Sequence, residues 1–189
     1  KADGGWKLNG QKIWITNGAE AGVFLVFANT DFSKGYKGIT AFLVPCDAPG
    51  FKVEFFWWTF NMPTDHAEVT MTDVRVGADA VFGRVDHGLD LAQTFVHENR
   101  IRQAASSLGA AQHCIDAAVA YANERTTWNR RLSTNQGIQF PLVELHTEAA
   151  MLRQLIRSTA AALDAQHHME VTHLVSMCNY RANRLACDA

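Results

Sequence analysis

The chain has 189 residues, of which 48% are apolar and 19% are charged, so it contains enough hydrophobic sequence to build a folded core. Its 17 basic residues do not outnumber its 19 acidic residues, and a net charge of −2 disfavours binding to a nucleic-acid backbone. The apolar runs are far shorter than the ~20 residues that a membrane-spanning helix needs. We therefore predict neither a nucleic-acid partner nor a membrane span.

The four cysteines are widely separated and form no Cys-x-x-Cys pair, which argues against a disulfide framework and against structural zinc. This usage fits a reducing compartment, either a bacterial cytoplasm or a mitochondrial matrix. The chain begins at Lys1 without an initiator methionine and stops at Ala189 inside a predicted helix. We therefore expect a fragment of a longer protein.

The composition changes near residue 88. Eleven of the 13 glycines and three of the four prolines lie at or before Gly88, whereas the sequence after it is rich in alanine. Turn-forming residues thus dominate the first part, and helix-permitting residues dominate the second. We predict a β domain over residues 1–87 and a helical domain over residues 88–189.

The first part is predicted to form antiparallel strands. Asn9-Gly10 predicts the two-residue turn of a hairpin between residues 6–8 and 12–15, because both turn positions need positive φ. Further runs of β-branched and aromatic residues predict strands at 24–28, 39–44, 51–56, 68–71 and 74–76. Short strands at intervals of roughly ten residues are typical of a β sandwich or barrel.

The second part is predicted to form three amphipathic helices. Apolar residues recur at three- and four-residue steps over 92–122, 145–163 and 171–185, with a polar break at 123–136. Pro141 is placed in the first turn of the second helix, where proline is tolerated. Such helices are typical of an up-down four-helix bundle whose fourth helix lies outside these residues. The predicted fold class is therefore α+β.

Trp14 and Thr16 are the first candidates for a binding site. Strict alternation along a strand would place both on one face, with Ile13 and Ile15 on the other. An indole beside a hydroxyl can stack on a planar cofactor and hydrogen-bond to it. An ordinary structural role in the sheet is the alternative, and the pattern alone favours it.

Arg125 is the second candidate, because it lies at the predicted end of the first helix, ahead of an aromatic residue and Gln136. A guanidinium there can bind a phosphate in bidentate fashion, or it can simply complement the helix dipole without a ligand. The segment 97–102 offers a similar choice. Its glutamate and two arginines form either an active-site cluster or a solvent-exposed ion-pair face.

Other common sites lack a matching motif. A di-iron bundle needs two Glu-x-x-His motifs, and the chain has one, at Glu170 and His173, so we predict no metal site. The sequence contains no Gly-x-Ser-x-Gly elbow, no Gly-x-Gly-x-x-Gly fingerprint and no Walker loop.

In their order along the chain, the motifs resemble the acyl-CoA dehydrogenase family. The matching segments are 8–18, 38–44, 50–51, 72–76, 99–109, 121–125 and 136–140, so that the likeness covers nearly the whole chain. It implies most of a middle β domain and three helices of a C-terminal bundle. It also implies FAD-dependent oxidation of an acyl-CoA thioester to the trans-2-enoyl-CoA, in which a base removes the α proton and the β hydrogen leaves as hydride.

The resemblance also implies roles for individual residues at the FAD. It places Trp14 against the isoalloxazine ring and Thr16 near the reactive nitrogen of the flavin. Arg125 and Gln136 match positions that reach the FAD of a partner subunit, at its pyrophosphate and nucleotide end, and Thr127 matches a weaker contact. We therefore expect a homo-oligomer, either a dimer or a dimer of dimers (a homotetramer), and we expect an isolated fragment to be inactive.

The substrate side is less complete. Arg100 matches an arginine that faces the acyl-CoA. Some family members place the catalytic glutamate at the position of Asn99, and Glu98 lies about 100° away around a helix, so neither is assigned as the base. The base is expected beyond Ala189, and an electron-transferring flavoprotein is the expected electron acceptor, as in fatty acid β-oxidation.

Two departures from the family pattern leave alternatives open. His97 stands where an aspartate is common, and Trp128-Asn129 stands where many members have Phe-Gly. These differences are compatible with a flavoprotein oxidase of the same fold that acts on a non-CoA substrate. The missing base is compatible with a non-catalytic scaffold.

Overall fold

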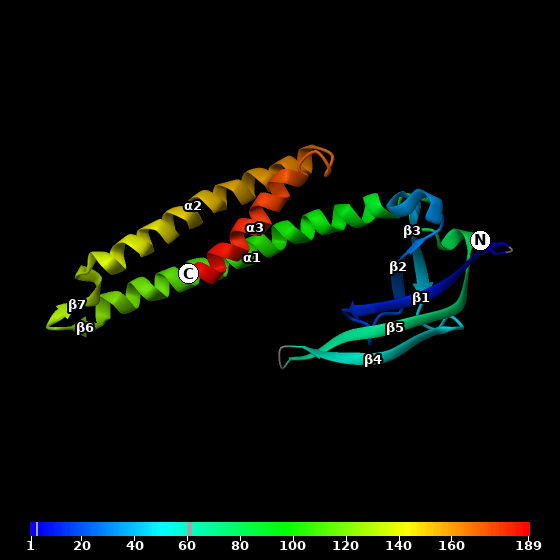
Figure 1. The fold of residues 1–189 in the computed structure, drawn as a ribbon, viewed down its shortest axis with the longest axis horizontal. Helices are drawn as coiled ribbons and strands as arrows, with labels where there is room; N and C mark the ends of the chain where they lie inside the picture. The colour runs from blue at the N-terminus through cyan, green and yellow to red at the C-terminus, as the bar shows by residue number, and fades with distance from the viewer. Residues whose placement is uncertain (3, 60–61) are drawn as a thin grey trace. The chain divides into compact units, whose positions relative to one another are not determined.

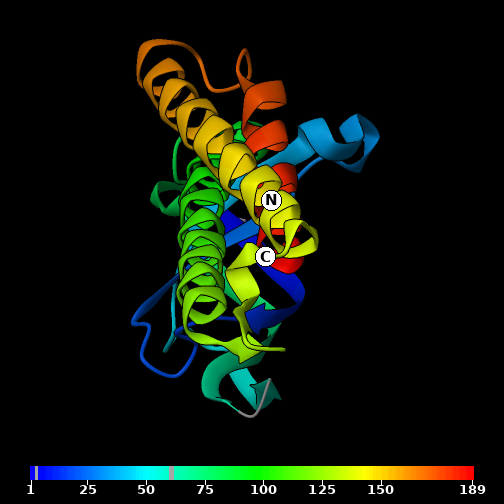
Figure 2. The same cartoon turned by 90° about the vertical axis from the view of Figure 1, so that its left-hand side faces the viewer.

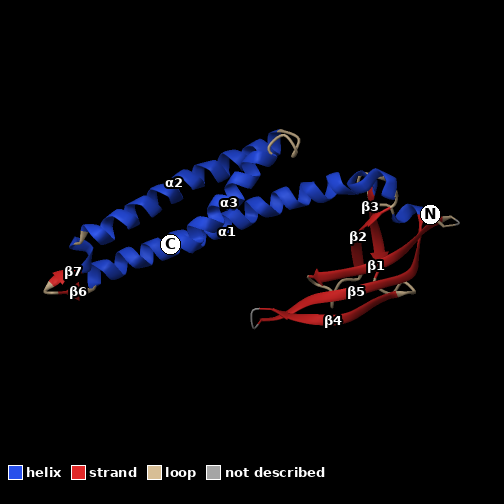
Figure 3. Ribbon diagram, viewed as in Figure 1, coloured by secondary structure: helices blue, strands red, loops and turns tan. Residues whose placement is uncertain are grey.

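The computed structural model describes residues 1–2, 4–59 and 62–189 (Figure 1). The chain divides into two compact units, Lys1–Ala92 and Gln93–Ala189. The long strands all lie in the first unit, and the second is helical except for one short hairpin (Figure 3). The predicted α+β class is confirmed. The predicted boundary between residues 87 and 88 stays a prediction.

The first unit contains two antiparallel sheets. A three-stranded sheet has the order β1-β5-β4, with β1 at Gly5–Ile15, β5 at Met62–Gly77 and β4 at Phe51–Thr59. A two-stranded sheet pairs β2 (Val23–Asn29) with β3 (Ile39–Pro45). Short 3₁₀ segments at Phe32–Gly38 and Ala78–Ala80 follow β2 and β5.

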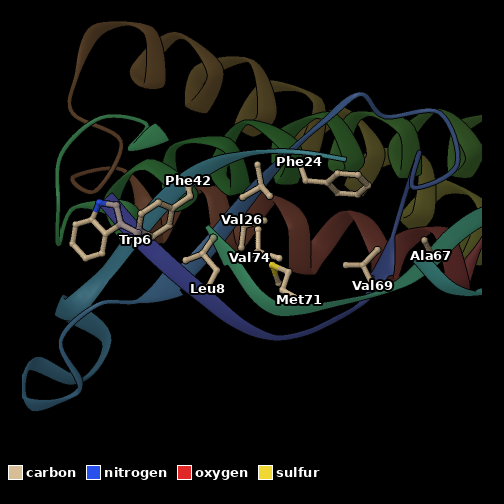
Figure 4. Close-up of a cluster of buried hydrophobic side chains, with 10 residues drawn as sticks. Trp6, Leu8, Phe24, Val26, Phe42, Ala67, Val69, Met71 and Val74 are labelled. Atoms are coloured by element: carbon tan, nitrogen blue, oxygen red, sulfur yellow. The ribbon is translucent and has the colours of Figure 1, made fainter. Parts of the chain in front are cut away.

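Strands of both sheets contribute to one core (Figure 4). Alternate side chains of each strand are buried there, because successive residues of a strand face opposite sides. The buried members are Trp6 and Leu8 of β1, Phe24 and Val26 of β2, Phe42 and Val44 of β3, and Ala67, Val69, Met71 and Val74 of β5. The Trp6 and Phe42 rings meet edge to face, with centroids 5.4 Å apart. This packing gives the antiparallel two-layer arrangement that the strand spacing predicted.

The predicted hairpin at Asn9-Gly10 is wrong, because β1 runs straight through these residues. Leu8 pairs with Val74 and Gly10 with Met71, so two residues of β5 oppose Asn9 in a bulge. Gly10 has a positive φ (+147°), but Asn9 does not, and the residue with a left-handed φ in the bulge is Asp73 of β5 (+54°). Asn9 accepts a hydrogen bond from the Asp73 backbone N–H at 2.8 Å. The bulge also explains why the strands predicted at 68–71 and 74–76 are one strand.

The helical unit is formed by α1 (Gly88–Glu124), α2 (Gln136–Ala165) and α3 (Thr172–Asp188), as predicted. Figures 1 and 2 show α2 running beside α1, with α3 packed along them. Their shared core is made of small and branched side chains: Ala104, Leu108, Ala111, Ile115, Ala149, Leu152, Ile156, Cys178, Ala182 and Leu185. The fourth helix of the predicted bundle stays a prediction.

The predicted position of Pro141 in a first turn is wrong. Helix α2 begins at Gln136, and the Asn135 side chain caps it by accepting a hydrogen bond from the Gly137 N–H at 2.9 Å. Pro141 therefore lies in the second turn.

Within the described parts of the chain, none of the helices combines the length and apolar composition needed to cross a membrane.

Candidate functional site

Trp14 lies in a second bulge, whose extra residue is in β1 itself. Lys12 pairs with Val69 and Ile15 with Ala67, so Ile13 and Trp14 together oppose one residue of β5. Trp14 takes a left-handed φ of +62°, which is costly for a bulky side chain. The predicted alternation over residues 13–16 is therefore wrong, because the extra residue breaks the period of two at Ile13 and Trp14 and because Thr16 lies beyond the end of the strand. Strand β1 ends at Ile15, and Thr16 is an exposed residue of the following turn.

The Trp14 indole is half-exposed, at 50%, and is in contact with a second tryptophan. Its ring centroid lies 4.7 Å from that of Trp57, with the planes tilted by 43°. Trp57 in turn meets Phe55 edge to face at 5.1 Å. Trp14 thus presents an aromatic surface of the kind that stacks on a planar ring. The cofactor roles of Trp14 and Thr16 stay predictions.

Arg125 leads from α1 into a tight hairpin. Its backbone N–H donates to the Tyr121 carbonyl, and its carbonyl accepts from the Leu132 N–H, both at 2.8 Å. Strands β6 (Thr126–Thr127) and β7 (Arg130–Arg131) then pair. Trp128 and Asn129 form the turn with φ of +53° and +60°, as a type I′ hairpin requires. The sequence indicated only a polar break here, because two-residue strands leave no periodic signal.

Thr127 and Gln136, two of the predicted FAD contacts, line one hollow of about 520 Å³ beside this hairpin. Its other lining residues are Trp128, Arg130, Arg131, Leu132, Thr134 and Asn135. Arg125 enters the hairpin but does not line the hollow. Two arginines and the N-terminus of a 30-residue helix give this region positive potential, which suits a phosphate group. The residues present therefore fit the pyrophosphate end of FAD.

Arg100, the predicted acyl-CoA contact, is exposed on α1 and belongs to a different hollow. This second hollow, of about 440 Å³, lies between α1 and α3 and is lined by Arg100, Ser176, Asn179, Tyr180, Asn183 and Arg184. Sequence reasoning missed Arg184, a second cation at the same place. The hollow's lining residues include no carboxylate, and the position of the catalytic base beyond Ala189 stays a prediction.

His97, three residues before Arg100, is buried at 1% exposure. Its Nδ1 lies 3.1 Å from Nδ1 of His168, in the connection between α2 and α3. The pKa of His97 is lowered, first by burial and then by the charges that His168 and Arg100 can carry. His97, which stands where the family commonly has an aspartate, thus contacts His168 inside the helical unit.

Acidification is expected to destabilise the helical unit through His97. Because the folded-state pKa lies below the unfolded value of about 6.5, the unfolded chain binds more protons as the pH falls, and the free energy of unfolding decreases. The loss begins near pH 6.5 and is complete below the folded-state pKa. Thermal unfolding of His97→Asn between pH 7.5 and 5.5 should show a smaller decrease than the wild type. His113→Asn, an exposed control on the same helix, should keep the wild-type decrease.

Comparison with known proteins agrees with these features. Residues 1–74 match the sequence model of the acyl-CoA dehydrogenase middle domain, and residues 86–189 match that of the acyl-CoA dehydrogenase C-terminal domain. The short/branched chain specific acyl-CoA dehydrogenase of Bos taurus mitochondria is 37% identical over 180 residues, which are 95% of this chain and 41% of the bovine protein. The chain thus spans less than half the length of this relative.

Solved structures show the same likeness. Butyryl-CoA dehydrogenase from Megasphaera elsdenii is 31% identical, with a TM-score of 0.77 over 98% of this chain and 50% of that one. Acyl-CoA dehydrogenase from Geobacillus kaustophilus is 27% identical, with a TM-score of 0.80 over 98% of this chain and 49% of that one. Both domain matches and both structures agree, and the chain belongs to the acyl-CoA dehydrogenase family.

Proposed function

We propose that this chain is part of an FAD-dependent enzyme that oxidises an acyl-CoA thioester to the trans-2-enoyl-CoA. The observation that carries the proposal is the match of residues 1–74 and 86–189 to two consecutive domains of a single enzyme family. The names of the relatives make short-chain and branched-chain acyl-CoAs the first substrates to test.

The residues of this chain have separate tasks in that reaction. Trp14 offers a half-exposed aromatic surface to the flavin ring. The exposed Thr16 offers a hydroxyl that hydrogen-bonds near the reactive nitrogen of the flavin. Arg125, with Thr127 and Gln136, binds the pyrophosphate and nucleotide end of an FAD held by a partner subunit. Arg100 faces the acyl-CoA. Bound FAD supplies the hydride acceptor, and the protein positions the substrate against it.

Because Arg125 and Gln136 act on the partner's FAD in this proposal, oligomerisation is part of the catalyst. A dimer or a dimer of dimers would complete each site. An electron-transferring flavoprotein would reoxidise the flavin, and the enzyme would work in a bacterial cytoplasm or in the mitochondrial matrix. The base that removes the α proton comes from sequence outside residues 1–189.

The visible absorption spectrum of the full-length gene product tests the proposal. Flavin bands that bleach on anaerobic addition of butyryl-CoA or a branched acyl-CoA are the expected result, because hydride transfer reduces the flavin. The oxidase alternative would be favoured by a different result. In that case the flavin bands persist with every acyl-CoA, but they bleach on addition of a non-CoA substrate and recover when dioxygen is admitted. A protein that binds no FAD would contradict the proposal and favour the scaffold.

A further inference from the structure

Trp14 does not stand alone on its sheet. Ala67, Val69 and Met71 of β5 point into the core, so the residues between them face the opposite side, called here the outer face of the three-stranded sheet. Phe55 pairs with Glu68, and Trp57 pairs with His66. Directly opposed residues share a face, so both aromatic side chains lie on the outer face.

Trp14 reaches the same outer face from the far side of the sheet. The strand order is β1-β5-β4, so β5 separates the strand of Trp14 from the strand of Trp57. Their rings nevertheless meet above β5, with centroids 4.7 Å apart. The bulge that gives Trp14 its left-handed φ of +62° therefore places its indole against Trp57. Trp14, Trp57 and Phe55 form a continuous aromatic row across the sheet.

Trp57 is the middle member of this row and differs from Trp14 in exposure. Trp14 is half-exposed, whereas the Nε1 atom of Trp57 is buried and has no hydrogen-bond partner in the described parts of the chain. Nδ1 of His66, the residue paired with Trp57, is also buried and without a partner there. A buried N–H without an acceptor is costly, and such groups call for a particular explanation. The polar edge of Trp57 thus lies inside the packing, whereas Trp14 presents the exposed aromatic surface.

We propose that Trp57 is a positioning residue that fixes the plane of the Trp14 indole against which the flavin packs. Contact with Trp57 covers one side of Trp14 and restricts rotation of its side chain, while Phe55 braces Trp57 edge to face. A stacking surface that is fixed before binding loses less conformational freedom when the ring arrives. The inference rests on the proposed function, because it assumes that Trp14 meets a flavin.

Trp57→Leu and Trp57→Phe test this role in the full-length gene product. Trp57→Leu removes the ring contact and is expected to weaken FAD affinity by roughly three- to tenfold, in line with the contribution of one aromatic pair. Trp57→Phe keeps an aromatic contact and should restore most of the affinity. Trp58→Leu is the matched control, because Trp58 is a neighbouring tryptophan of β4 that is 65% exposed and has no ring contact with Trp14. It should leave affinity unchanged.

A measurement on the apoprotein tests the Trp14–Trp57 contact separately from its effect on FAD binding. Two indoles in contact couple their electronic transitions, so the apoprotein should show a bisignate far-ultraviolet circular dichroism band. Trp14→Phe and Trp57→Leu should each abolish this band, and Trp58→Leu should keep it. Thermal unfolding of every variant identifies any that fails to fold. If Trp57→Leu does not fold, the FAD affinity of Trp57→Phe is compared with that of the wild type instead.

The outcomes are distinguishable. Loss of the band together with weaker FAD binding in Trp57→Leu supports the positioning role. If Trp14→Phe weakens FAD binding while Trp57→Leu binds FAD as tightly as the wild type, Trp57 does not position Trp14, although the proposed function stands. Absence of the band in the wild-type protein would show that the Trp14 and Trp57 rings are not in contact, which overturns the inference. If the wild type binds no FAD, the proposed function fails, and the positioning role fails with it.

Discussion

Replacing Arg125 by alanine is expected to lower the FAD affinity of the full-length gene product by about 10- to 100-fold. A hydrogen bond to a charged group contributes about 1.5–3 kcal/mol, and a bidentate arginine–phosphate contact lies toward the upper end. The substitution should leave the fold intact, because Arg125 is exposed and its backbone is held at 2.8 Å by Tyr121 on one side and Leu132 on the other. Titration of the apoprotein with FAD, followed by flavin fluorescence, gives the affinity.

Two further variants sharpen the Arg125 test. Arg125→Lys keeps the charge but loses the bidentate geometry, so its affinity should fall between those of wild type and Arg125→Ala. Arg157→Ala removes an exposed arginine from α2, away from the hairpin, and should have no effect. Unchanged affinity in Arg125→Ala would show that this residue is not the phosphate contact.

The proposal that Arg125 acts on a partner's FAD makes a separate prediction. A mixed dimer of Arg125→Ala and Trp14→Ala subunits should contain one site with both substitutions and one site with neither. Half of the wild-type FAD occupancy should therefore return. If Arg125 acted within its own subunit, each site would carry one substitution and occupancy would stay low.

Much of the fold follows from patterns that depend on neighbours along the chain. Strands β2 and β3 have their predicted limits to within one residue, because apolar alternation and flanking turn residues are local signals. The three helices were found from three- and four-residue spacing for the same reason. The start of α2 was placed late, because Gln136 and Gly137 lack the apolar repeat and only the Asn135 cap marks the helix end.

The errors in β1 have a different origin. Asn9-Gly10 has the chemistry of a turn, but Asn9 pairs with a residue 64 positions away, and that long-range partner decides the conformation. The bulge at Trp14 likewise depends on the register against β5. Register is a property of two strands, so one strand's sequence cannot reveal an extra residue in it. The strict alternation predicted through Ile13 and Trp14 was wrong for this reason.

The same limit applies to the candidate site. Thr127 and Gln136 lie close along the chain, and the structure places them in one hollow. Trp57 was not recognised, because its contact with Trp14 depends on the order β1-β5-β4 and joins residues 43 positions apart. Its only local signal was an unusual aromatic run at 55–58, which by itself is equally typical of a buried strand.

Phe42→Ala is expected to cause the largest loss of stability among these variants. Phe42 is fully buried in β3, at 0% exposure, and its ring packs edge to face on Trp6. Truncating a buried phenylalanine removes its transfer free energy and leaves a cavity, at a cost of about 3–5 kcal/mol. Because a domain's total stability is about 5–15 kcal/mol, much of the protein carrying this variant should be unfolded well below the wild-type denaturant midpoint.

Leu43→Ala is the matched control for Phe42→Ala. Leu43 is the next residue of β3, faces the opposite side and is 41% exposed, so its truncation should cost much less. Four of the five tryptophans lie in Lys1–Ala92, so tryptophan fluorescence during urea unfolding mainly reports this unit, whereas far-ultraviolet circular dichroism mainly reports the helices of Gln93–Ala189. Equal midpoints for Phe42→Ala and Leu43→Ala would contradict the position of Phe42 in the core. A shift in fluorescence without a shift in helical signal would show that the two units unfold independently, because the Phe42 cavity then weakens only the unit that contains it.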